Sequence, residues 1–173
     1  MNIYGITQSA LERYFADIGE NPFKAGIIFD GIYKCGIEDF AEFGFADRIT
    51  ARLNSDFEFE TPEVVERLDG GDAAKLLLRL KDGEYAETVL MRQKFGNVLC
   101  VSTQVGCNMG CVFCQSGRMK KRRNLSAGEI MGQVMAIKRQ FGEEVGGVSV
   151  MGSGEPFDNF DEVRDFCGIV SND

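Results

Sequence analysis

The sequence predicts an α/β chain in which a small helical domain and a short antiparallel β meander precede the first βα units of a (β/α) barrel. Three observations support this order. Apolar residues recur at helical spacing to about residue 55, short runs rich in Val, Leu and Thr follow, and strand and helix patterns alternate from residue 104. We therefore expect a helical accessory domain (1–55), a β-rich linker (56–92) and a core (93–173).

The first domain is expected to be a small helical bundle. Thr7 is placed to cap a helix with an apolar face that ends at Gly19. Asn21-Pro22 then supplies a cap and a first-turn proline for a second helix. Two shorter helices, at residues 37–43 and 46–53, complete the bundle, and its Phe and Ile stripes are interpreted as core.

Four short strands are expected next, because apolar runs alternate there with turns that contain glycine. The turns are Asp69-Gly70-Gly71, Lys81-Asp82-Gly83 and Phe95-Gly96-Asn97. The expected strands cover residues 64–68, 75–80, 86–92 and 98–102. They form an antiparallel meander that leads into a cysteine-rich loop.

The last part has a βα pattern. Ser126 and Glu129 form a capping box that opens a helix to about Gln140. A buried strand at 145–151 and a helix at 160–170 follow. Two such units cannot close an eight-stranded barrel, which needs at least about 200 residues. The chain is therefore expected to be a fragment with a truncated core.

Composition limits the class of protein. The chain has 173 residues, a net charge of −8 and six cysteines, and it shows neither a signal-peptide pattern nor an apolar run of transmembrane length. Clustered cysteines without a secretion signal indicate free thiols in a reducing cytosol and a bound metal, so a cytoplasmic protein without a membrane is expected.

Charge is distributed unevenly. Residues 101–140 carry 7 basic and 1 acidic side chains, although the chain as a whole is acidic. Five of those basic residues form a basic island, which we define as Arg118, Lys120, Lys121, Arg122 and Arg123. The island is either a solvated loop or a rim that contacts phosphates, and its position beside the cysteines favours the rim.

Three cysteines have the spacing C-x3-C-x2-C, at Cys107, Cys111 and Cys114. Structural zinc sites usually have four protein ligands, whereas this chain has no second pair and no histidine. Three thiolates suit a [4Fe–4S] cluster in which one iron stays open to a substrate or cofactor. A zinc site and three buried, inert thiols are the alternatives. Cys35 and Cys167 are interpreted as packing residues.

A glycine-rich turn, Gly152-Ser153-Gly154-Glu155-Pro156, follows the strand at 145–151. Sites of α/β proteins are built at the carboxyl ends of parallel strands. Glycines at Gly152 and Gly154 allow the backbone to approach a ligand closely, and Glu155 offers a carboxylate to an ammonium group. A tight turn with a surface glutamate is the alternative.

These motifs resemble those of the radical S-adenosylmethionine (SAM) superfamily, in which a C-x3-C-x-aromatic-C loop is followed by a "GGE" element. Within it, the chain resembles the RNA adenosine C2-methyltransferases called RlmN. The likeness is most specific in Cys-Val-Ser-Thr-Gln-Val-Gly-Cys (100–107) and Met-Gly-Ser-Gly-Glu-Pro-Phe-Asp-Asn (151–159). Further matching segments are 86–89, 111–114 and 123–134. Gln115 and Ser153 are small departures from the family pattern.

The resemblance implies methyl transfer to carbon 2 of adenosine in 23S ribosomal RNA and transfer RNA. One SAM methylates a protein cysteine, and a second SAM, reduced by the [4Fe–4S] cluster, starts radical addition to the base. The implied cluster ligands are Cys107, Cys111 and Cys114, and Gly154 and Glu155 hold SAM. Glu87 resembles a proton-transferring carboxylate, and Cys100 resembles the cysteine that resolves a protein–RNA crosslink.

The resemblance also implies an electron donor such as flavodoxin, an RNA-binding role for the helical domain, and a monomer. The family's methyl-carrying cysteine lies near the far C-terminus and has no counterpart here; Cys167 is a poor substitute. We therefore expect this fragment to be inactive alone. The alternatives are a relative specific for carbon 8, a non-catalytic iron–sulfur or RNA-binding module, and a zinc-binding structural domain.

Overall fold

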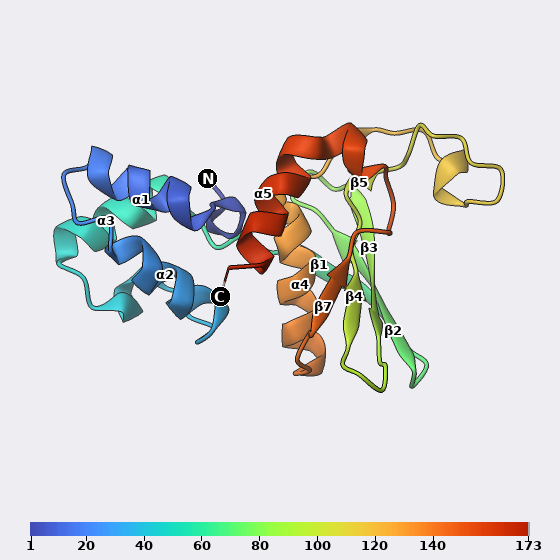
Figure 1. The fold of residues 1–173 in the computed structure, drawn as a ribbon, viewed down its shortest axis with the longest axis horizontal. Coiled ribbons are helices and arrows are strands. Elements are labelled where there is room, and N and C mark those ends of the chain that lie inside the picture. Colours follow the sequence, from blue (N-terminus) through green and yellow to red (C-terminus); the bar gives the residue numbers. More distant parts are fainter. Residues whose placement is uncertain (173) are drawn as a thin grey trace.

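The computed structural model describes residues 1–172, which form a helical bundle beside a mixed α/β core (Figure 1). The bundle contains α1 (Gln8–Asp17), α2 (Lys24–Tyr33) and α3 (Asp47–Asp56), with short 3-10 helices at Ile3–Gly5 (η1) and Phe40–Phe43 (η2). Thr7 caps α1 as expected, because its hydroxyl accepts a hydrogen bond from the Ala10 amide. Aromatic and aliphatic side chains fill the centre of the bundle, and Phe15, Ile28 and Leu53 are fully buried.

Two elements of the bundle differ from the expectation. Helix α2 begins at Lys24, after Pro22 rather than at it, because the Asn21 side chain accepts a hydrogen bond from the Phe23 amide and closes a turn first. Of the helix expected at 37–43, only η2 forms, and it ends at Gly44, which has φ 65°. Short polar side chains stabilise such local turns in competition with a regular helix.

The core contains one five-stranded sheet. Its strands are β1 (Glu63–Asp69), β2 (Ala73–Arg79), β3 (Tyr85–Met91), β4 (Val98–Cys100) and β7 (Gly147–Ser149), in the order β1-β2-β3-β4-β7. All neighbours are antiparallel except β4 and β7, which are parallel. The meander and the first strands of the barrel therefore form one continuous sheet. The domain boundaries at 55 and 92 stay predictions.

The two faces of the sheet differ. Alternate residues of β2, β3 and β4, including Leu76, Leu90 and Leu99, are fully buried in one apolar core. Ile130 and Ile137 of α4 (Ala127–Phe141) belong to the same core, and α4 and α5 (Phe160–Val170) lie on one side of the sheet (Figure 1). The residues that alternate with these buried ones along β2, β3 and β4 point to the opposite face of the sheet, which we call the open face.

A two-stranded ribbon continues from the sheet. Strand β5 (Gln104–Val105) pairs with β6 (Arg123–Asn124), and the cysteine-rich segment between them, residues 106–122, projects from the core (Figure 1). We call this segment the cysteine loop; it contains one short 3-10 helix, η3 (Ser116–Arg118). None of the helices within residues 1–172 is long and apolar enough to cross a membrane.

The first six residues join the bundle to the core. The Ile3 amide donates a hydrogen bond to the Glu58 carbonyl, and Arg139 of α4 pairs with both Tyr4 and Glu38. A Cβ atom added to Gly5 would lie 2.6 Å from the amide nitrogen of Gly128 at the start of α4. The bundle is thus packed directly against the helix that follows the cysteine loop.

We expect Leu76→Ala to lower the free energy of unfolding by about 2–5 kcal/mol, because it leaves a cavity in the core. Leu76 is 0% exposed, whereas Leu68 of the neighbouring strand is 51% exposed. The matched variant Leu68→Ala should change stability by no more than about 0.5 kcal/mol. Urea denaturation followed by circular dichroism would measure both, and equal losses would contradict this assignment of the two faces.

Candidate functional site

Three segments meet at the carboxyl ends of the parallel strands β4 and β7. They are residues 101–104, which follow β4, the cysteine loop, and residues 150–156, which follow β7. The Thr103 and Gln104 amides both donate to the Ser153 carbonyl, at 2.9 and 3.1 Å. The Gly152 amide donates to the Val101 carbonyl at 2.9 Å. The two segments that follow the strands are therefore held together backbone to backbone.

Close contact between the two segments requires glycine at two positions of the turn. A Cβ atom on Gly152 would lie 2.6 Å from the Val101 carbonyl oxygen and 2.7 Å from the Ser102 amide nitrogen. Gly154 has φ +114°, and its Cβ would lie 2.6 Å from the Thr103 hydroxyl. Any larger residue would push the turn away from the strand ends. Contact between these glycines and a ligand stays a prediction.

Glu155 is half-buried, and hydrogen bonds hold both its backbone amide and its carboxylate. Its amide donates to the Gln104 side-chain oxygen at 3.0 Å, and its carboxylate oxygen Oε1 accepts from the Phe157 amide at 3.1 Å. That second bond caps the 3-10 helix η4 (Pro156–Asn159). Its other oxygen, Oε2, has no hydrogen-bond partner in the part of the chain that the structure describes. A carboxylate held in this way can accept from an ammonium group at Oε2.

Buried polar side chains form the floor of the site. Gln133 of α4 binds the Ser102 backbone twice, since it accepts from the amide and donates to the carbonyl, each at 2.8 Å. The Ser102 hydroxyl donates to the Glu87 carbonyl at 2.6 Å and accepts from the Ser153 amide at 3.0 Å. Asn159 donates to the Thr103 carbonyl at 2.9 Å. Sequence reasoning gave none of these side chains a role, although polar residues directly after a buried strand were a usable signal.

The cysteine loop has a closed neck. The Cys107 amide donates to the Met119 carbonyl at 3.0 Å, and Gly106, with φ +74°, packs against the Lys120 backbone. The loop also reaches the glycine turn, because the hydroxyls of Ser116 and Ser153 lie 2.9 Å apart. The loop that carries the cysteines and the turn that carries Glu155 are therefore in direct contact.

The three thiols are placed differently. Cys107 is buried, Cys114 is half-buried and Cys111 is exposed. No group of three side chains within residues 1–172 has the geometry to hold a metal ion, so the predicted ligands are on one loop but not assembled. Their chemistry fits an iron–sulfur cluster, because the loop offers thiols and no histidine or carboxylate.

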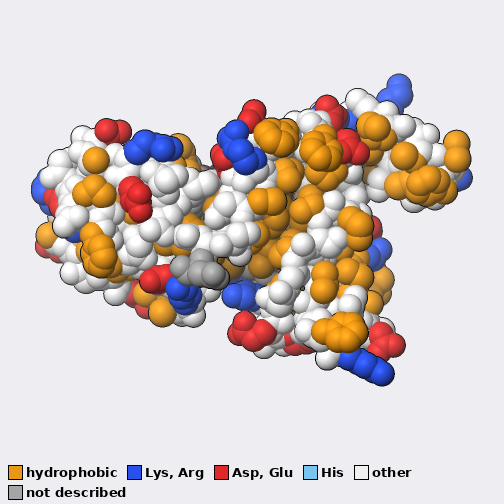
Figure 2. Space-filling model, viewed as in Figure 1, with side chains coloured by type: hydrophobic (Ala, Val, Ile, Leu, Met, Phe, Trp, Pro, Cys, Tyr) orange, Lys and Arg blue, Asp and Glu red, His pale blue; other side chains and the backbone are white. Residues whose placement is uncertain are grey.

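Hydrophobic side chains gather on the projecting cysteine loop (Figure 2). Met109, Val112 and Phe113 are exposed, the last two to about nine-tenths, at 88% and 90%. Clusters of exposed apolar side chains are typical of interaction surfaces, because monomeric proteins rarely expose large contiguous apolar patches. They surround the predicted cluster ligands.

Cys100 and Glu87 share the open face. Val89 is the cross-strand partner of Cys100, and Glu87 lies two residues from Val89 on the same strand. Cys100 is half-buried, and burial raises the pKa of its thiol while a hydrogen bond from the Met151 amide partly opposes the rise. Glu87 is exposed and pairs with Lys75 at 2.9 Å. The structure thus brings Cys100 next to the start of the glycine turn.

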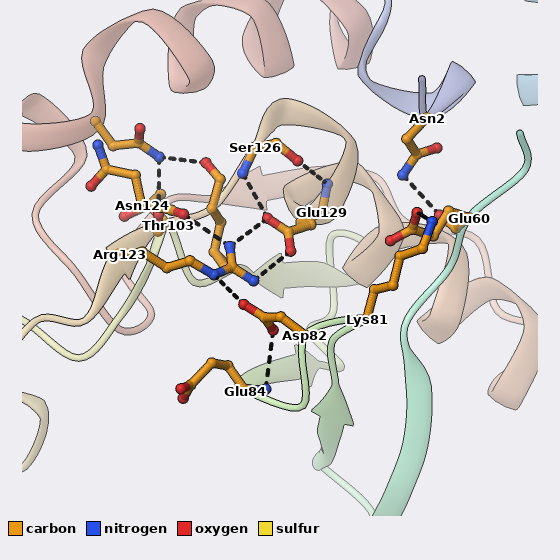
Figure 3. Close-up of polar contacts among 12 residues, drawn as sticks. Asn2, Glu60, Lys81, Asp82, Glu84, Thr103, Arg123, Asn124, Ser126 and Glu129 are labelled. Atoms are coloured by element: carbon orange, nitrogen blue, oxygen red, sulfur yellow. Dashed lines mark hydrogen bonds and ion pairs between the residues drawn. The ribbon is translucent and has the colours of Figure 1, made fainter. Parts of the chain in front are cut away.

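Most of the basic island is paired with acidic side chains. Lys121 pairs with Asp158 and Arg122 with Glu84, each at 2.8 Å. Arg123 pairs with both Asp82 and Glu129, at 2.6 and 2.7 Å (Figure 3). Arg118 and Lys120 are exposed and have no ion pair among the described residues. The island therefore anchors the exit of the cysteine loop, and two of its cations stay available to a ligand.

Two family models match the chain. The model of the radical SAM superfamily matches residues 101–173, and the model of the ribosomal RNA large subunit methyltransferase N-terminal domain matches residues 1–57. A solved structure of a radical SAM methyltransferase from Sphaerobacter thermophilus superposes with a TM-score of 0.86 at 33% identity. The superposition covers 100% of this chain and 52% of that one.

Curated relatives show the same similarity. Proteins named probable dual-specificity RNA methyltransferase RlmN are 44% identical over 181 residues in Streptococcus thermophilus and 41% identical over 175 residues in Clostridium perfringens. The matches cover 99% of this chain but 46% and 50% of those proteins, so the chain spans about half the length of the curated relatives it matches. The chain therefore belongs to the radical SAM superfamily, as an RlmN-like N-terminal portion.

Proposed function

We propose that this chain works as the N-terminal part of a radical SAM methyltransferase that methylates carbon 2 of adenosine in 23S ribosomal RNA and transfer RNA. One observation carries the proposal: the cysteine loop, the Glu155 turn and Cys100 meet at the carboxyl ends of two parallel strands. The names of the relatives support the reaction class. A cytoplasmic location and a monomeric state are part of the same proposal.

In this proposal Cys107, Cys111 and Cys114 hold a [4Fe–4S] cluster, and Gly154 and Glu155 hold the amino group of SAM. When bound, the cluster and SAM supply the methyl group and the radical chemistry. Binding of the cluster would require the exposed Cys111 thiol to come together with those of Cys107 and Cys114. Glu155 already has one carboxylate oxygen fixed by the Phe157 amide, so the carboxylate is oriented before SAM binds.

Glu87 and Cys100 act on the RNA base from the open face. Burial raises the pKa of the Cys100 thiol and so disfavours its thiolate further, and the thiol becomes a nucleophile only after it loses a proton. Cys100 resolves the protein–RNA crosslink, and Glu87 exchanges protons with the base. The exposed carboxylate of Glu87 is held near that face by Lys75.

The proposed macromolecular partners are RNA and an electron donor such as flavodoxin. RNA phosphates are bound by cations, and Arg118 and Lys120 are the members of the basic island that have no carboxylate partner within the described part of the chain. The helical domain contacts the same RNA. The family match over residues 1–57 to a ribosomal RNA methyltransferase domain supports that role.

We expect the change of any one of Cys107, Cys111 and Cys114 to Ala to abolish the cluster. Three thiolates are the fewest that bind a [4Fe–4S] cluster with one open iron, so no ligand can be spared. Anaerobic reconstitution with iron and sulfide, followed by visible absorption and iron analysis, would give about four irons per wild-type chain. Cys35→Ala is the control, because Cys35 is exposed in the bundle and is not the packing residue that the sequence suggested. A full cluster in Cys111→Ala would refute the assignment.

SAM is expected to change the spectrum of the reconstituted cluster only when Glu155 is intact. Glu155→Ala removes the fixed carboxylate that accepts from the SAM ammonium group, so SAM binding weakens about tenfold or more, which corresponds to the loss of a charged hydrogen bond. The measurement is electron paramagnetic resonance of the reduced cluster at increasing SAM concentration. Glu144→Ala, at an exposed glutamate before β7, is the control. An unchanged SAM response in Glu155→Ala would remove this residue from the site.

The role of Cys100 can be tested in a chimera that joins residues 1–173 to the remaining half of the Clostridium perfringens relative. Cys100→Ala should still bind its cluster and cleave SAM. It should then accumulate RNA crosslinked to protein, because no thiolate is placed to release the product. Gel electrophoresis after nuclease treatment would detect the crosslinked species.

A packing role for Cys100 would give a different result. The variant would lose at most a few kcal/mol of stability and would release methylated RNA normally. Val98→Ala, at a half-buried residue that shares the open face of the same strand, controls for loss of packing. Normal release without crosslink in Cys100→Ala would leave this cysteine with a packing role alone.

A further inference from the structure

Gln104, Asp158 and Lys121 form a continuous chain of polar contacts between the cysteine loop and the Glu155 turn. We propose that these three side chains are positioning residues that hold the cysteine loop and the Glu155 turn in register, so that the residues expected to hold the cluster and those expected to hold SAM keep their relative places. The inference rests on the proposed function, and it adds three residues that are not among the expected ligands of either cofactor.

Gln104 is the centre of this chain. It is 0% exposed, and its whole amide group is engaged. The oxygen accepts from the Glu155 amide at 3.0 Å, and the nitrogen donates to Asn124 at 2.9 Å and to Asp158 at 3.2 Å. One buried side chain therefore touches the turn that carries Glu155, the strand at the exit of the cysteine loop and the helix η4.

Lys121 extends the chain into the cysteine loop. Its ammonium group donates to the same Asp158 carboxylate oxygen that Gln104 binds, at 2.8 Å. Its backbone amide donates to the Asn108 side chain at 3.1 Å, one residue after Cys107. The Lys121 side chain is 19% exposed, so its ion pair is better shielded from water than most ion pairs of this surface.

The neighbours of Lys121 make different contacts. Arg122 pairs with Glu84 in the turn between β2 and β3, and Arg123 pairs with Asp82 in that turn and Glu129 of α4. These two residues hold the base of the cysteine loop to the sheet and to α4. Within the described residues, Lys121 is the member of the basic island that pairs with the segment after the Glu155 turn, through Asp158.

Register between the loops matters because the two halves of the site come from different segments. The cysteines lie on the projecting loop, whereas Glu155 lies after β7. Binding constellations lose function when their members shift by about 1 Å. Within residues 1–172, one further side-chain hydrogen bond joins the two loops besides the Gln104–Asp158–Lys121 chain. It links the Ser116 and Ser153 hydroxyls at 2.9 Å.

The test compares Lys121→Met with Lys94→Met, since Lys94 is exposed before β4 and has no ion pair in the described structure. Both changes remove one ammonium group and keep an unbranched side chain. Asp158→Asn is a second variant that removes the charge from the partly exposed carboxylate. Hydrogen exchange of the metal-free chain is measured first, so that the result does not depend on cofactor loading.

We expect Lys121→Met and Asp158→Asn to speed exchange about threefold in both loops, at residues 107–119 and 152–157, as loss of one ion pair of about 0.2–1 kcal/mol predicts. Lys94→Met should leave both loops unchanged. After reconstitution the Lys121 and Asp158 variants should contain as much iron as the wild type, yet need about threefold more SAM for half of the spectral change.

The inference would be overturned if Lys121→Met and Asp158→Asn exchanged at the same rates as Lys94→Met in both loops. Faster exchange in the cysteine loop alone would also overturn it. Unchanged SAM dependence in the two variants would also overturn it. A wild-type chain that binds no cluster, or binds one that ignores SAM, would instead contradict the proposed function. Exchange in the metal-free chain would then still decide whether Lys121 couples the two loops.

Discussion

The site depends on a buried polar segment, Ser102–Gln104, that directly follows β4. Backbone and side-chain groups of such a segment are costly to bury unless each finds a hydrogen-bond partner. Those partners come from every element around the site: Gln133 of α4, Ser153 of the glycine turn, Asn159 of η4 and the Glu87 carbonyl of β3. No buried side-chain nitrogen or oxygen within residues 1–172 lacks a partner. The segment therefore fixes the distances between the sheet, α4 and the glycine turn. The positions of Cys100 and Glu155 depend on these distances.

Electrostatics explains how an acidic chain carries a basic island. The negative side chains that give the net charge of −8 include Asp82, Glu84 and Asp158, which pair with the island. The cations Lys121 and Arg122 thus mainly hold the exit of the cysteine loop in place, while Arg118 and Lys120, which have no ion pair within residues 1–172, can bind a polyanion. Repulsion between the acidic surface and any polyanion is screened within about 8 Å at physiological salt, so the local arrangement of charges outweighs the net charge.

The cysteine loop is ordered at its neck and open at its tip. The hydrogen bond from the Cys107 amide to the Met119 carbonyl closes its neck, and the Ser116–Ser153 contact ties it to the glycine turn, whereas Cys111, Val112 and Phe113 are exposed. The exposed tip of such a loop can rearrange without disturbing the sheet beneath it. Burial of a large apolar side chain stabilises a complex by about 1.5–3 kcal/mol. The exposed apolar side chains of the loop would therefore contribute strongly to the binding of any partner that covers them.

The sequence by itself predicted the element order, the capping box at Ser126, the meander and the position of the glycine turn, because caps, turns and apolar periods are local signals. It also identified the three cysteines by spacing, although their roles stay predictions. Only the tertiary structure joined β4 to β7 in the same sheet as the meander, placed Cys100 and Glu87 on the same face, and, within residues 1–172, divided the basic island into paired and unpaired cations. Partners such as Lys121 and Asp158, 37 residues apart, are brought together by the packing of β7 beside β4. Local sequence carries no signal for such a pair, because long-range contacts depend on the whole chain.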